Sequence, residues 1–306
     1  MLETSDNILL TPLTIERGFK SCRGAVKKYF KHQIWATHNL PGNHRRALDA
    51  VLANLMRTID LLDLESASAL PLDVWHEVRD ELSDAFRDKC STVELAALVH
   101  TVRKFSIPKQ YLFDPLRGAD LWIRNRKFET FEELEAFCSF VGGSALTSTM
   151  PILGVIQPDY ELASLECGKA IMLTQLLANC ANDAKLNRFF LAEEDFVDCG
   201  VDKTQMKLRR GDKSFRFLVR LYVARIEKML MNCKQLVQHL DFDGTRTLKS
   251  LLAMHWQMLL KMQHVPECIL SEEGVLTGRE LLILKSRHLM GMEKELAICE
   301  DEPAHH

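Results

Sequence analysis

Two segments of the sequence place acidic and amide side chains at helical spacing. In the segment RTIDLLD, Asp60 and Asp63 stand three residues apart. In the segment QLLANCAND, Asn179 and Asp183 stand four residues apart. Residues three or four apart share one face of a helix. If both segments are helical, each pair presents its oxygen atoms side by side.

Oxygen ligands on two facing helices suit Mg²⁺, a hard cation that usually shares its coordination sphere with substrate phosphates. Basic side chains beside the acids would bind the remaining phosphate oxygens. Asp183 ends a nearly uncharged segment, residues 163–183, so it would border an apolar interior. These features favour a magnesium–diphosphate site. The alternative is a pair of solvated helix faces, because acids one turn apart are common on exposed helices.

Helix signals dominate the rest of the chain. S/T-x-x-E capping boxes begin at Ser91, Thr130 and Thr277, and Asp73 and Asp159 are candidate N-caps. Apolar residues recur at helical spacing, and no alternating strand pattern with a hairpin turn occurs. The expected helices span residues 20–38, 43–64, 73–87, 92–105, 109–125, 131–155, 159–183, 213–240, 245–264 and 277–292. We expect one all-α domain over residues 1–292 and a flexible tail over residues 293–306.

Bulk composition narrows the function classes. The chain has 306 residues, 47% of them apolar, and a formal net charge of −3, which argues against a general nucleic-acid partner. Nine dispersed cysteines without a CxxC motif, and an N-terminus without the pattern of a signal peptide, favour reduced, buried thiols in a cytoplasmic protein. Residues 136–158 carry no charge, and we expect a buried core helix there rather than a membrane span.

Several motifs, in order, resemble the squalene/phytoene synthase family, whose helical enzymes join two prenyl diphosphates head to head. The basic helix with Lys27 and Lys28 precedes Leu40-Pro41, Arg46-Ala47 and the Asp60–Asp63 segment, as in the family. The segment TFEELEAFCSFVGG is similar to the family's T-x-E-E-L-x-x-Y-C-x-x-V-A-G. The helix from Gly168 to Asp183, Asn187-Arg188 and Ala224-Arg225 resemble further family motifs, so the similarity covers about residues 20–290.

The resemblance implies an isoprenoid synthase helical bundle with a central cavity. It implies Asp60, Asp63 and Asp183 as catalytic residues and Mg²⁺ ligands. It also implies a set of substrate-binding residues: Arg57, Gln175, Asn179, Lys185 and Arg188. A substrate would be a prenyl diphosphate. The sequence leaves open whether a reductive step with NADPH follows.

The sequence departs from the family pattern at several motif positions. Ile59 stands where the first motif begins with aspartate, and Asn179 stands where the second does. Isoleucine supplies no oxygen ligand, and asparagine lacks the charge that retains a divalent cation. The tyrosine expected after Arg188 is Phe190. Upstream of the second motif, where the family carries Gln, Asn and Arg, this sequence has Met172, Gln175 and Ala178 instead.

Three functions therefore stay open: a divergent prenyl-diphosphate synthase, a non-catalytic protein that binds an isoprenoid or acts beside an active paralogue, and an assembly protein that has kept only the fold. Two basic clusters suggest peripheral contact with an anionic membrane, against the alternative of solvated helix faces. They are residues Arg17, Lys20, Arg23, Lys27, Lys28 and Lys31, and Lys203, Lys207, Arg209, Arg210, Lys213, Arg216 and Arg220.

Overall fold

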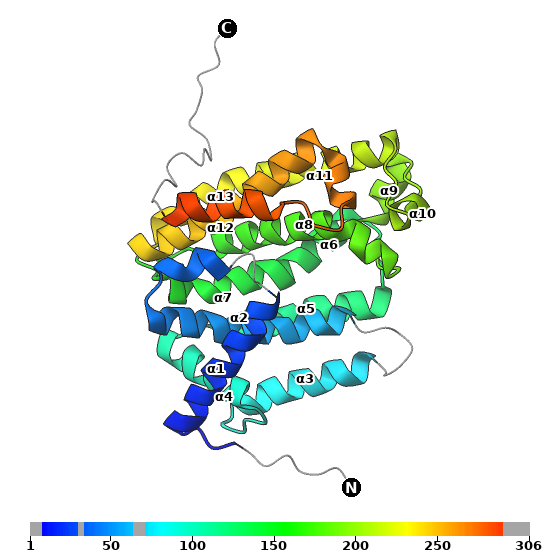
Figure 1. Cartoon of the computed structure of the whole chain (residues 1–306). Helices are drawn as coiled ribbons and strands as arrows, with labels where there is room; N and C mark the ends of the chain where they lie inside the picture. The colour runs from blue at the N-terminus through cyan, green and yellow to red at the C-terminus, as the bar shows by residue number, and fades with distance from the viewer. Residues whose placement is uncertain (1–7, 30–33, 64–70, 290–306) are drawn as a thin grey trace.

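The computed structural model describes residues 8–29, 34–63 and 71–289, and over these residues the protein is an all-α bundle (Figure 1). No β-strand occurs in these ranges, where the only bridges join Ile8 to Cys90 and Val155 to Leu240. The α-helices are α1 (Pro12–Tyr29), α2 (Gly42–Asp63), α3 (Pro71–Ala85), α4 (Val93–Phe105), α5 (Gln110–Asn125), α6 (Phe131–Cys138), α7 (Ser144–Leu153), α8 (Glu161–Lys185), α9 (Glu193–Cys199), α10 (Lys203–Lys207), α11 (Lys213–Asn232), α12 (Phe242–His264) and α13 (Gly278–Leu289). Shorter helical segments are η1 (Ile34–Asn39), η2 (Ser139–Gly143), η3 (Cys233–His239) and η4 (Pro266–Leu270). The predicted all-α fold is confirmed.

The helices stack in layers (Figure 1). At one end of the molecule α1 packs across α2 and α4, and α3 packs on α5. The middle layers contain α2, α7 and α8, with α7 in contact with both of its neighbours. At the opposite end α11 and α12 cover α8. The helices that carry the two sequence motifs, α2 and α8, therefore lie in the interior of the bundle.

Two glycines allow α8 to approach η2 at backbone distance. A Cβ atom added to Gly168 would lie 2.2 Å from the carbonyl oxygen of Gly142, and one added to Gly142 would lie 2.5 Å from the carbonyl oxygen of Gly168. Side chains cannot be accommodated at such distances, so glycine is required on both sides of the crossing. The segment η2 is a π-helical turn between α6 and α7, a local widening that often re-aims a helix.

A buried polar network holds α9 against α11. The Asp195 side chain is 3% exposed and accepts hydrogen bonds from the Tyr222 hydroxyl at 2.7 Å and from Arg225 at 2.6 Å. The same Tyr222 oxygen accepts a hydrogen bond from the backbone N–H of Ala192 at 3.0 Å. Burial raises the pKa of the Tyr222 hydroxyl above its ordinary value, which keeps the hydroxyl a donor to Asp195.

The N-cap residues differ from the predictions at several helix ends. Thr130 and Thr277 cap their helices as expected. At the capping box expected to begin at Ser91 the N-cap is Thr92 instead, because the Thr92 hydroxyl accepts from the backbone N–H of Leu95. Asp73 lies inside the first turn of α3, and Asp159 precedes the N-cap of α8 with φ of 63°, so neither is an N-cap.

The remaining predictions concern the uncharged segment, the cysteines and the tail. The stretch Phe131–Leu153 is long and apolar enough to cross a membrane by length and composition, but 67% of its apolar 18-residue segment is buried inside the bundle. Eight cysteines within the described ranges are free thiols, all buried except the half-buried Cys268, as predicted. Cys299 and the predicted tail over residues 293–306 lie outside the described residues.

Candidate functional site

A cavity of about 600 Å³ lies between α2, α7, α8 and α12. Gly168 and Asp183 both line it and stand fifteen residues apart on α8, so the cavity extends about 22 Å along that helix. Most of its wall is aliphatic, and the apolar lining includes Leu48, Leu52, Leu55, Val141, Leu146, Met172, Leu176 and Leu251. Cavities of this size and lining typically hold small apolar ligands.

One end of the cavity, here called the Asp183 end, contains residues predicted from the second motif. Arg188 donates a hydrogen bond of 3.0 Å to the Asp183 carboxylate, and both side chains are largely buried. The Asn179 side-chain amide donates to the backbone carbonyl of Gln175 at 2.9 Å, and Asn179 also lines the cavity. Ile59 of α2 lines the same cavity, so an alkyl group stands at the position of the first motif aspartate.

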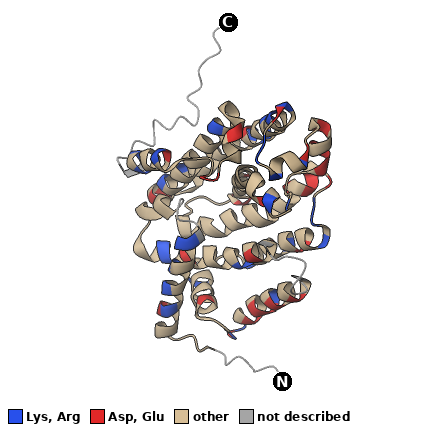
Figure 2. Ribbon diagram, turned by 45° about the vertical axis from the view of Figure 1, so that its right-hand side comes forward, with Lys and Arg blue, Asp and Glu red and all other residues tan. Residues whose placement is uncertain are grey.

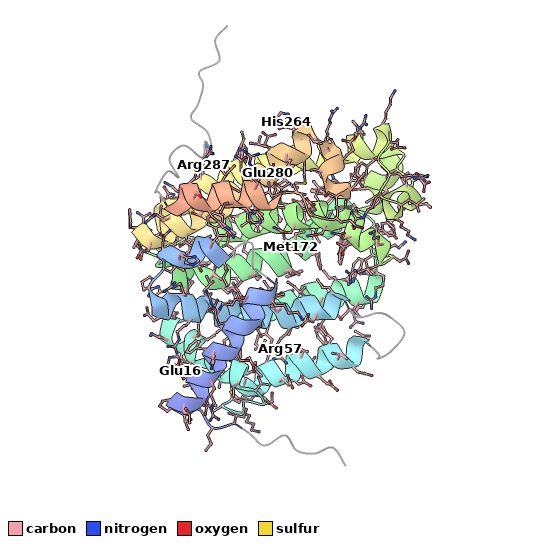
Figure 3. The ribbon with its side chains drawn as sticks, viewed as in Figure 1. Glu16, Arg57, Met172, His264, Glu280 and Arg287 are labelled. Carbon is pink, nitrogen blue, oxygen red and sulfur yellow. The ribbon has the colours of Figure 1, made fainter. Side chains whose placement is uncertain are left out.

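The structure does not bring Asp60 and Arg57 into this cavity. Both line a separate hollow of about 250 Å³, and Arg57 pairs with Glu81 of α3. Figure 3 shows Arg57 on the side of α2 that faces α3, whereas Met172 of α8 lies beyond the opposite side of α2, near α7. A residue next to Ile59 is rotated by about 100° around the helix, which places Asp60 on another face. The side chain of Asp63 lies outside the described residues.

Lys185 and Gln175 have different surroundings. Lys185 is exposed and pairs with Glu272 at 2.8 Å, outside the cavity lining. Gln175 lines the middle of the cavity, and its amide lies 2.9 Å from Nε2 of the fully buried His255. Sequence analysis did not assign His255 to the site. The sequence offered one signal, a histidine within the apolar face of a long helix.

The His255 contacts fix the orientation of the Gln175 amide. Nδ1 of His255 lies 2.8 Å from the carbonyl oxygen of Leu251, so Nδ1 carries the proton and Nε2 accepts. Gln175 must therefore present its NH₂ group to His255, which leaves its carbonyl oxygen on the cavity side. Burial lowers the pKa of His255 to about 4, so the ring stays neutral at physiological pH.

The shifted pKa of His255 predicts an acid-sensitive fold. The folded pKa is about 4 and lies below the unfolded value of about 6.5, so the stabilisation is complete above pH 6.5 and is lost as the pH falls toward 4. We expect this histidine to account for about 2 kcal/mol of stability lost between pH 7.5 and pH 5. Denaturant unfolding of wild type and His255→Gln at both pH values measures it.

The matched control for this pH experiment is the exposed His264, whose replacement by glutamine should leave the pH dependence unchanged. If His255→Gln loses as much stability as wild type on acidification, then His255 does not titrate in this range and the expectation fails.

The opposite end of the cavity, here called the Asp49 end, contains an ion pair between a buried carboxylate and a half-buried guanidinium, which sequence analysis did not assign. Asp49 of α2 lines the cavity and is 4% exposed. Both of its carboxylate oxygens accept from Nη1 of Arg23 of α1, at 3.0 and 3.2 Å. Burial raises the pKa of Asp49, and the neighbouring Arg23 offsets only part of the rise.

Comparison with known proteins gives consistent results. A phytoene synthase from Arthrospira platensis is 23% identical over 273 residues, covering 85% of this chain and 88% of its own length. Phytoene synthase 3, chloroplastic, from Zea mays is 25% identical over 264 residues, covering 82% of this chain, and the chain spans only 61% of that relative. The family model for squalene/phytoene synthase matches residues 26–279.

The chain belongs to the squalene/phytoene synthase family. Solved structures show the same fold. A dehydrosqualene synthase in complex with ligand superposes with a TM-score of 0.79 at 20% identity, covering 92% of this chain and 99% of that one. The squalene synthase HpnC from Alicyclobacillus acidocaldarius gives 0.73 at 17% identity, covering 83% and 96%. The predicted family and isoprenoid synthase fold are confirmed.

The family resemblance implies Mg²⁺, but the described donors do not fit a magnesium cluster. Within residues 8–29, 34–63 and 71–289, no group of three or more His, Cys, Asp or Glu side chains is arranged to hold a metal ion. At the Asp183 end the carboxylate is bound to Arg188, the Asn179 NH₂ group is bound to its own helix, and Ile59 offers no oxygen. A cluster of Mg²⁺ ions requires several carboxylates that converge on one point.

Many of the basic residues that suggested membrane contact are engaged within the fold. Arg23 pairs with Asp49, Lys203 with Glu193 and Arg216 with Glu267. Figure 2 shows Lys and Arg positions and Asp and Glu positions distributed over the same bundle of helices. Peripheral membrane contact stays a prediction.

Proposed function

We propose that this squalene/phytoene synthase family member binds a long isoprenoid chain in its central cavity without ionising a prenyl diphosphate through Mg²⁺. The aliphatic lining and the length of about 22 Å suit an extended apolar chain. Ile59 most directly supports the proposal that the protein does not ionise a prenyl diphosphate. It places an alkyl group where a diphosphate–metal complex would need an oxygen ligand. A non-catalytic protein that binds an isoprenoid could act beside a catalytic paralogue.

Head-to-head condensation of two prenyl diphosphates is the second candidate. Family membership favours it, and so does the presence of Asp183 and Arg188 at the end of the cavity. In that function Asp60, Asp63 and Asp183 would bind Mg²⁺, and Arg188 would bind phosphate. The two candidates differ in one measurable property, the dependence of ligand binding and diphosphate release on Mg²⁺.

We expect isoprenoids of 15 to 20 carbons to stabilise the purified protein equally with Mg²⁺ and with EDTA, and no diphosphate to be released. A ligand at a hundred times its Kd raises the free energy of unfolding by about 2.7 kcal/mol. Thermal unfolding with farnesyl and geranylgeranyl compounds and a diphosphate assay measure both quantities. Release of diphosphate by wild type only with Mg²⁺ would establish the condensing function instead.

Three variants locate the binding and test the role of the missing acids. Ala145→Phe fills the cavity and should abolish the stabilisation, whereas Ala25→Phe in the separate hollow should keep it. The double variant Ile59→Asp, Asn179→Asp restores two carboxylates and should make stabilisation by farnesyl diphosphate depend on Mg²⁺. If no isoprenoid stabilises wild type under any condition, the binding function is wrong and the assembly function gains support.

A further inference from the structure

The Asp49 end of the cavity differs chemically from the Asp183 end. It contains the buried Asp49 carboxylate and three threonines that line the same cavity, Thr37 of η1, Thr149 of α7 and Thr247 of α12. His44 bonds to the carbonyl oxygen of Ile152 at 2.7 Å, which joins the start of α2 to the end of α7. Gly244 contacts the Leu153 backbone and joins the start of α12 to the same place. Asp49, Thr149 and Thr247 each lie within five residues of one of these contacts, which places them toward the same end of the cavity.

The hydrogens of the three threonine hydroxyls are already used. Thr37 donates to the carbonyl oxygen of Ile34 at 2.8 Å, and Thr149 donates to that of Leu146 at 2.7 Å. Thr247 donates to the carbonyl oxygen of Asp243 at 2.9 Å. A hydroxyl has one hydrogen to donate and two lone pairs that accept. Each threonine oxygen can therefore take part in a further hydrogen bond only as an acceptor.

The Asp49 carboxylate also only accepts. Its two oxygens offer about four lone-pair positions, and the Arg23 contacts occupy two of them. Arg23 already compensates its negative charge, so the remaining lone pairs favour a neutral donor over a second cation. A buried acceptor that meets only apolar ligand atoms costs free energy, whereas a ligand hydroxyl removes that cost. The Asp183 end, by contrast, contains the Arg188 guanidinium, which donates.

We infer that the cavity selects an isoprenoid that carries a hydroxyl, and that the hydroxyl binds at the Asp49 end. This inference rests on the proposed isoprenoid-binding function and names its ligand class. Asp49 is the specificity-determining residue, and Arg23 positions its carboxylate. An isoprenoid hydrocarbon, or an ether that can only accept hydrogen bonds, leaves this end unsatisfied.

The test compares three compounds of 15 carbons in the isoprenoid part: farnesol, farnesyl methyl ether and farnesene. For wild type we expect farnesol to bind about tenfold more tightly than the ether or the hydrocarbon, as one additional hydrogen bond in a buried site allows. Calorimetric titration of the full chain measures the three Kd values. Equal affinity of farnesol and its methyl ether would overturn the inference while leaving the proposed function intact.

The decisive variant replaces both members of the Arg23–Asp49 pair, Arg23→Leu with Asp49→Leu. Replacing both partners by apolar residues avoids an unpaired buried charge, so the protein should fold. We expect the preference for farnesol to fall to within about twofold while the affinity for farnesene is unchanged. The matched control Asp120→Leu with Arg124→Leu removes a surface pair on α5 and should keep the preference.

Two other results would contradict the inference. A preference for farnesol that survives in the Arg23, Asp49 variant would place the hydroxyl elsewhere, for example at the Asp183 end. Absence of binding by all three compounds in wild type would contradict the proposed isoprenoid-binding function itself. It would also contradict the ligand class inferred from that function.

Discussion

Gly168→Ala is expected to destabilise the protein by about 3 kcal/mol or more, although alanine is ordinarily the better helix former. The added Cβ atom would lie 2.2 Å from the carbonyl oxygen of Gly142 and 2.8 Å from the Cα atom of Gly143. Both neighbouring atoms belong to the backbone, so this steric clash can be relieved only if η2 and α8 move apart. Because Gly142 and Gly168 both line the cavity, separation of η2 from α8 would also alter the shape of the cavity. Urea unfolding of the variant and of wild type gives the difference.

The matched control is Gly24→Ala in the interior of α1, where an added Cβ atom meets nothing within 4 Å. There we expect stabilisation by about 0.5 to 1 kcal/mol, the ordinary gain in helix propensity. The two substitutions are chemically identical and should differ in sign. If Gly168→Ala also stabilises, α8 and η2 do not cross at backbone distance.

The second large effect is expected at Asp195. Asp195→Ala should destabilise the protein by about 3 to 5 kcal/mol, the usual result of removing one partner from a buried, hydrogen-bonded charge network. The substitution leaves the Arg225 guanidinium and the Tyr222 hydroxyl without their acceptor. It therefore loosens α9 from α11. Chemical denaturation at neutral pH measures the loss.

Two further variants separate the contributions at Asp195. Tyr222→Phe removes one hydrogen bond and should cost only about 1 to 2 kcal/mol. Asp195→Ala combined with Tyr222→Phe should cost less than the sum of the single changes, because the two residues share one network. A fully additive double variant would show that Tyr222 and Asp195 act independently, contrary to the observed 2.7 Å contact.

The interior helices were predictable from sequence because their signals extend over many residues. The expected helix at 43–64 corresponds to α2, and the one at 159–183 corresponds to α8, each within two residues at either end. Apolar periodicity over more than fifteen residues outweighs local ambiguity. The expected helix at 20–38 was wrong, since α1 begins at Pro12 and ends at Tyr29, and η1 follows as a separate segment.

Short helices escaped prediction. No helix was expected between residues 183 and 213, yet α9 and α10 lie there and extend over seven and five residues. Their stability comes from contacts distant in sequence, such as the hydrogen bond from the backbone N–H of Ala192 to Tyr222. Segments of one or two turns contain too few residues to show a period.

The candidate site was predictable where its residues are close in sequence. Asp183 and Arg188, both assigned to the site from sequence, are five residues apart and are hydrogen-bonded to each other. Arg23 with Asp49, and Gln175 with His255, are separated by 26 and 80 residues, so only the tertiary fold brings them together. A partial signal existed for Asp49, an acidic residue beside Leu48 and one turn before Leu52 within the apolar stripe of α2.

The alkylation rates of the buried thiols measure how often the helices around them separate. Only a thiolate reacts with alkylating reagents, and burial raises the pKa of Cys22 and of Cys180 to about 12. Labelling in native buffer therefore proceeds only through transient local separation of helices. Cys22 lies on α1 and Cys180 on α8, so their separate labelling rates distinguish fraying at the edge of the bundle from breathing at its centre.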